Sequence, residues 1–80
     1  MRYIPKGVCS QAIDIELEGN IVKHVQFTGG CHGNLQGIAR LVEGMQAEDA
    51  IAKIRGIRCG FKSTSCPDQL ANALEAALNQ

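Results

Sequence analysis

The sequence predicts an α+β domain in which an antiparallel hairpin or small sheet is followed by three helices. Two runs of alternating polar and apolar residues, 8–18 and 21–27, are joined by Glu18-Gly19-Asn20, a strong turn signal. Apolar residues then recur at helical spacing in three later stretches. Eighty residues allow one domain only, so we expect residues 1–80 to form a single unit.

Residues 1–7 should form an irregular lead-in, because Pro5 and Gly7 interrupt regular structure. The first alternating run then predicts a strand. Strict alternation places one set of side chains toward the core: Cys9, Gln11, Ile13, Ile15 and Leu17. In the second strand, 21–27, the same rule predicts Ile21, Val25 and Phe27 inward and Val22, His24 and Gln26 outward.

Three helices should follow. Asn34 is a favourable N-cap for the first, and Gly44 ends this helix or lies in its last turn. Close packing against the sheet would explain Gly37 in its interior. The second helix should open at 46–49, with acidic residues in its first turn, and stop at Gly56. A short extended piece over 57–61 leads to the third, about 68–78. Ser65 and Asp68 resemble a capping box there, and Pro67 lies where the first turn tolerates it.

Composition excludes several classes of partner. Eight basic and eight acidic side chains cancel, so we expect no nucleic-acid binding, which normally shows as a basic excess. No apolar run reaches the roughly 20 residues that a membrane span needs, and residues 1–7 lack the apolar core of a signal peptide. We therefore expect a cytoplasmic chain with reduced thiols and a protein partner, and the sequence leaves open whether it forms a homodimer.

Four cysteines, Cys9, Cys31, Cys59 and Cys66, are the main candidate site, and we expect the fold to gather them at one end. A core this small is marginal, and a bound metal often stabilises such domains. Cys31 and Cys66 each precede a predicted helix, where free N–H groups favour a thiolate. We predict that all four bind zinc, with an iron–sulfur cluster in the same site as the alternative, and that the net negative charge is offset by Lys6, Arg58 and Lys62.

Other interpretations remain open. The four thiols could pair as two disulfides, or some could be buried as small hydrophobic residues, which suits Cys9. His32 could replace one thiolate or act as a proton donor beside Cys31. One thiolate of low pKa, Cys31 or Cys66, could instead act as a nucleophile or persulfide carrier. We expect a binding or accessory module and not an enzyme.

The run Thr64-Ser65-Cys66-Pro67-Asp68 spells the motif for which the TSCPD domain is named. With four cysteines in eighty residues, the whole chain resembles the small stand-alone members of that family. Related domains lie at the C-terminus of cobalamin-dependent ribonucleotide reductases. The resemblance implies metal binding and, as a further alternative, an accessory role in ribonucleotide reduction.

The order of predicted elements also resembles that of iron–sulfur cluster assembly scaffold proteins, in which three cysteines bind zinc or a nascent cluster. Cys9, Cys31 and Cys66 match the three scaffold positions, and residues 41–51 resemble the segment between the scaffold's helices. Gln11 stands where scaffolds carry Asp, Ser65 where they carry His, and Cys59 is extra. A fourth thiolate in place of an exchangeable ligand implies a closed, more permanent site.

Overall fold

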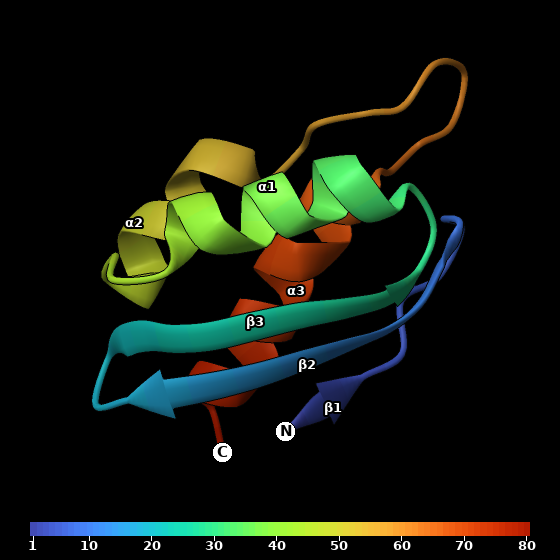
Figure 1. The fold of residues 1–80 in the computed structure, drawn as a ribbon. Coiled ribbons are helices and arrows are strands. Elements are labelled where there is room, and N and C mark those ends of the chain that lie inside the picture. The colour runs from blue at the N-terminus through green and yellow to red at the C-terminus, as the bar shows by residue number, and fades with distance from the viewer.

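The computed structural model describes all 80 residues, as a three-stranded antiparallel sheet followed by three helices (Figure 1). The sheet has the order β1-β2-β3. This arrangement confirms the predicted α+β class. The elements are β1 (Arg2–Tyr3), β2 (Ser10–Glu18), β3 (Ile21–Gly29), α1 (His32–Val42), α2 (Ala47–Ile54) and α3 (Cys66–Leu78).

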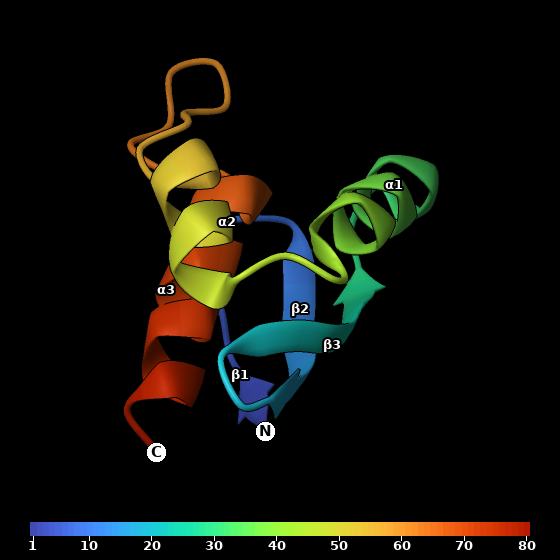
Figure 2. The ribbon, with the colours of Figure 1, turned by 90° about the vertical axis from the view of Figure 1, so that its left-hand side faces the viewer.

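The helices cover the sheet unequally. Figure 2 shows α3 on one side of the sheet with α2 packed against it, while α1 lies beside β3 on the other side of the view. The core lies between α3 and the strands, and its largest fully buried side chains are Ile13, Val22, Leu70 and Leu74. Because α3 supplies two of these four, its first residues, which carry Cys66, are fixed relative to the sheet.

The lead-in predicted over residues 1–7 is wrong in one respect, because it contains β1. Arg2 pairs with Asp14 and Tyr3 with Ile13 in antiparallel register. The guanidinium of Arg2 also lies 3.0 Å from the carboxylate of Asp14, on an exposed surface. A two-residue strand has no periodicity of its own, so only its partner strand reveals it.

Two register shifts overturn part of the predicted facing of side chains. One shift lies between Ser10 and Ala12, so Ser10 is buried while Cys9 and Gln11 are exposed, the reverse of the prediction. The other lies between Glu16 and Leu17 in β2, opposite the start of β3. Strict alternation fails because an extra residue in one strand reverses the facing of every residue beyond it.

The second shift affects the beginning of β3. Val22 is fully buried and Ile21 is 36% exposed, so these two predicted positions are exchanged. Beyond the shift the prediction holds, because Val25 is buried and His24 and Gln26 are exposed.

The helices follow the predicted order with one different start. Cys31, not Asn34, is the N-cap of α1, and it makes no side-chain capping bond. Gly37 faces open space, so the close packing expected there is wrong. Gly44 and Gly56 follow α1 and α2 with φ of 89° and 87°, which confirms them as helix terminators. Residues 57–61 form no strand.

The free edge of β3 is partly occupied by a side chain from the end of α1. The Val25 N–H donates to the Glu43 carboxylate at 3.2 Å, and His24 Nδ1 lies 3.2 Å from the same oxygen. None of the helices has the length and apolar character needed to cross a membrane.

Candidate functional site

All the segments that carry cysteine meet at one end of the sheet. Figure 1 shows the start of β2, the turn from β3 into α1, the loop from α2 to α3 and the start of α3 at the same end. The four cysteines are free thiols; Cys66 is 9% exposed, and Cys9, Cys31 and Cys59 are exposed. The fold therefore brings together segments that are far apart in the sequence.

Cys9 and Cys66 form the centre of this region. The thiol of Cys66 lies 3.4 Å from the hydroxyl of Ser10, the residue that follows Cys9, and interacts with the Cys9 side chain. Because the register shift buries Ser10, it turns Cys9 outward beside the first turn of α3. The two thiols come from residues 57 positions apart (66 minus 9).

Gly30 lies close to the Cys9 side chain. A Cβ at this position would lie 3.2 Å from the Cys9 sulfur and 2.9 Å from a methyl carbon of Leu35. The backbone of Gly30 also has φ of 76°, which side chains disfavour. Only glycine therefore lets the turn before Cys31 approach the Cys9 sulfur this closely.

The surroundings lower the pKa of the Cys9 thiol. The largest cause is hydrogen bonding with the Cys66 side chain, and the backbone amides of Cys31 and Cys9 and the positive charge of Lys62 act in the same direction. Partial removal from water opposes them. The sequence did not indicate Cys9 as a thiol of lowered pKa.

The motif Thr64–Asp68 fastens the loop that carries Cys59 to the start of α3. Ser65 accepts a hydrogen bond from the Asp68 N–H at 3.2 Å and donates one to the Ile57 carbonyl at 2.5 Å. The Asp68 carboxylate accepts from the Gly56 N–H at 2.7 Å and from the Thr64 hydroxyl at 2.5 Å. The predicted cap at Ser65 is confirmed, but Asp68 binds the loop and not the Ser65 backbone. The hydrogen bond from Thr64 is the largest cause of a lowered pKa at Asp68, and the bond from the Gly56 N–H acts in the same direction.

Gln69 extends this network to the segment that precedes Cys9. Its side chain accepts from the Lys6 N–H at 3.1 Å and donates to the Thr64 hydroxyl at 2.9 Å. Sequence reasoning missed both Gln69 and Ser10. A glutamine one turn after Ser65 gives no signal by itself, because only the structure shows that it is 7% exposed.

Cys59 is exposed and lies in the loop 57–64, of which residues 57–63 are exposed. No three side chains of His, Cys, Asp or Glu are grouped closely enough to hold a metal ion in this conformation. Two of the four proposed donors, Cys9 and Cys66, already adjoin. The third, Cys31, is the residue whose backbone amide hydrogen-bonds with the Cys9 thiol.

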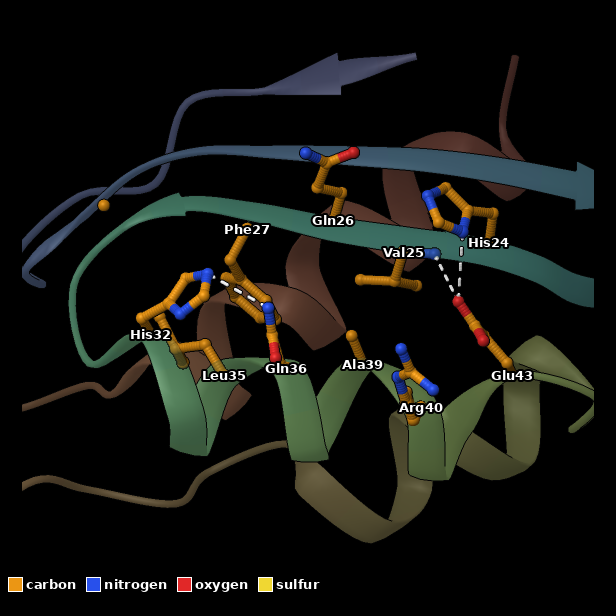
Figure 3. A pocket seen from close by; sticks show the side chains of 11 residues that line it. His24, Val25, Gln26, Phe27, His32, Leu35, Gln36, Ala39, Arg40 and Glu43 are labelled. Atoms are coloured by element: carbon orange, nitrogen blue, oxygen red, sulfur yellow. Dashed lines mark hydrogen bonds and ion pairs between the residues drawn. The ribbon is translucent and has the colours of Figure 1, made fainter.

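A separate groove of about 460 Å³ lies between β3 and α1 (Figure 3). Its lining includes Arg40, and Glu43 and His24 lie at one end. At the other end His32 forms a hydrogen bond of 3.0 Å with the Gln36 amide. His32 lines this groove, and no cysteine does.

Comparison with known proteins identifies a family. No curated protein and no solved structure matches the chain, so the resemblance to iron–sulfur scaffold proteins is not shown. The family model described as the TSCPD domain matches residues 1–78 of the 80 residues. The motif that positions Cys66 and the loop base is the one that gives this family its name. The chain belongs to the TSCPD domain family.

Proposed function

We propose that this domain is a metal-binding accessory module in which Cys9, Cys31, Cys59 and Cys66 bind one zinc ion. The observation that carries the proposal is the meeting of Cys9 and Cys66, from opposite ends of the chain, beside the turn that presents Cys31.

The chemistry of the donors supports zinc. Thiolate ligands favour zinc or an iron–sulfur cluster over hard cations such as Mg²⁺ or Ca²⁺. The positive charge of Lys62 acts on Cys9, and Arg58, in the same loop 57–64, forms no ion pair with an acidic side chain. Four thiolates around a dication carry a net charge of about −2, which such cations stabilise.

Metal analysis of anaerobically purified protein tests the proposal. We expect close to one zinc per chain, protection of the thiols from alkylation, and release of that protection by a chelator. Less than about half a metal per chain, with four freely reactive thiols, would contradict it. Visible absorbance of the same sample identifies an iron–sulfur cluster in the same site as the nearest variant.

Substitutions assign the ligands. Cys9→Ser, Cys31→Ser and Cys66→Ser should each reduce zinc affinity strongly, because each removes a direct bond to the ion. His32→Ala is the matched control: its ring is bonded to Gln36, so zinc content should be unchanged. A loss of zinc in His32→Ala would instead assign the histidine as a ligand.

A second candidate function, thiol or persulfide chemistry at Cys9, is favoured by its exposure and lowered pKa. It requires that Cys9 react faster than the other three thiols with iodoacetamide at neutral pH. Removal of the neighbouring thiol in Cys66→Ala should slow that reaction. Equal rates at all four cysteines in the metal-free protein would exclude this function.

A further inference from the structure

The groove between β3 and α1 runs along the free edge of the sheet. β3 is the last strand in the order β1-β2-β3, so no strand pairs with its outer edge. Figure 3 shows β3 along one side of the groove and α1 along the other. Four apolar side chains line it; Val25, Leu35 and Ala39 are buried and Phe27 is half-buried. Its volume of about 460 Å³ is in the range of natural ligand sites, about 300–1,000 Å³.

The backbone of β3 presents unpaired groups along this groove. Val25 turns its backbone away from β2, because its N–H donates to Glu43. Ile15, the partner of Val25 in β2, agrees with this, since its N–H and carbonyl both bond to Met1. Backbone direction alternates along an antiparallel pair, and no register shift lies between Val25 and Phe27. The N–H and carbonyl of Phe27 therefore face the same free edge, and neither bonds outside the sheet.

These backbone groups match an extended peptide better than a compact small molecule. A peptide that adds to a sheet edge bonds through its own N–H and carbonyl groups, and alternate side chains enter the neighbouring pockets. Glu43 already occupies the Val25 N–H, so it closes one end of the edge. The part that remains open is the stretch around Phe27, beside the apolar side chains of α1.

Arg40 adds a charge preference to the groove. Its exposed side chain lines the groove and forms no ion pair with any acidic residue. Glu43, the one acidic residue in the lining, is already bonded to the Val25 N–H and lies 3.2 Å from His24 Nδ1. In Figure 3 Arg40 lies between Ala39 and Glu43, on the side toward Phe27. A carboxylate from a ligand would thus find a guanidinium able to bond it through two N–H groups.

We propose that this groove binds an extended segment of a partner protein, which adds as a fourth strand beside Phe27 and places a carboxylate on Arg40. The carboxylate is that of an Asp or Glu side chain or of a chain terminus. The inference goes beyond the metal centre and does not depend on it, because no cysteine lines the groove. It supplies the accessory module with a surface for its partner.

Selection from peptide libraries tests the proposal without a known partner. Two phage-displayed libraries of random octapeptides, one with free C-termini and one with both ends blocked by flanking sequence, are selected on the immobilised domain. We expect enrichment of peptides in which one carboxylate is combined with alternating apolar residues. Synthetic versions labelled with fluorescein give the affinity by anisotropy. Amidation of the C-terminus, or Asp→Asn and Glu→Gln in the peptide, identifies the source of the carboxylate.

Charge reversal assigns the contact. Arg40→Glu should weaken binding of the selected peptide by at least about tenfold, because it replaces an attractive charge pair by a repulsive one. Lys53→Glu is the matched control: this residue is exposed on α2, has no ion pair and does not line the groove. Its affinity should equal that of wild type. Circular dichroism of both variants confirms that the fold is retained.

Amide hydrogen exchange reads the strand addition directly. Saturating peptide should slow exchange of the Phe27 N–H by at least about tenfold, because an amide bonded to an added strand exchanges only when that bond opens.

Three results would overturn the proposal: no enrichment from either library, equal binding to wild type and Arg40→Glu, or binding that leaves exchange at Phe27 unchanged. The last result would show a ligand that is held by side chains alone. Zinc analysis of Arg40→Glu keeps this test apart from the proposed function, since its zinc content should equal that of wild type. Loss of peptide binding with zinc retained leaves the metal centre intact, and absence of zinc with peptide binding retained leaves the groove intact.

Discussion

The residue that links the family motif to the fold is Ser65, and its replacement by alanine gives the sharpest test of the reasoning. Ser65 is 3% exposed, caps α3 through the Asp68 N–H and holds the loop through the Ile57 carbonyl. Loss of a serine cap costs about 0.5–2 kcal/mol. The carbonyl of exposed Ile57 can turn to water, so the second bond adds little to that cost.

We therefore expect Ser65→Ala to lower the free energy of unfolding by about 1–2 kcal/mol. A domain of this size has a total stability of about 5–10 kcal/mol, so the change is a sizeable fraction. The corresponding decrease in Tm is about 4–15 °C. Urea unfolding followed by far-ultraviolet circular dichroism measures it, with the m-value unchanged if the folded state keeps its extent.

Ser63→Ala is the matched control, because Ser63 is exposed in the same loop and its side chain makes no hydrogen bond. Its effect should stay within about 0.5 kcal/mol. If the two variants were equally stable, the capping role of Ser65 would be wrong. If Ser65→Ala were destabilised without faster tryptic cleavage in the loop, the Ile57 contact would not hold the loop base.

Three further predictions concern the sheet turn, the core and pH. Gly30→Ala should destabilise the domain by about 1–2 kcal/mol or more and weaken zinc binding, because its Cβ would meet Cys9 and Leu35 at a position of positive φ. Gly37→Ala, in open space on a helix, should instead stabilise the domain by about 0.5–1 kcal/mol. Urea titrations of both variants, with zinc competition, check these expectations. Leu74→Ala removes a fully buried side chain and should cost about 2–5 kcal/mol, measured in the same way; a cost below 1 kcal/mol would contradict the core assignment. Hydrogen bonds from Thr64 and Gly56 lower the pKa of folded Asp68, so its charged form stabilises the domain above the unfolded pKa of about 3.9 and this contribution is lost as pH falls through the lower folded value. The difference in stability between wild type and Asp68→Asn should accordingly be present at pH 7 and disappear well below about pH 4, and a difference that does not depend on pH would refute it.

The helices and the strand pairing could be predicted from the sequence because their signals are local. Alternation, turn residues and helical spacing each act over a few positions, and Gly44, Gly56 and Ser65 end or begin helices as expected. The capping bond at Ser65 is likewise a contact between residues three positions apart.

The facing of Cys9 could not be predicted, because a bulge depends on pairing with another strand. The extra residue near Gln11 reverses the strand's parity and exposes a thiol that alternation places in the core. The bond from Lys6 to Gln69 joins residues 63 positions apart, and no local pattern encodes such a contact. The candidate site is therefore assembled largely by tertiary contacts.

The carboxylate of Glu43 has a consequence for behaviour at high concentration. An exposed edge strand offers unpaired N–H groups as a template on which another chain can add and aggregate. By holding the Val25 N–H, Glu43 places a charged side chain in the middle of the β3 edge, where an incoming strand would need to bond. Glu43 therefore hinders strand addition at this point of the β3 edge, and it is a residue to leave untouched in engineered versions of this domain.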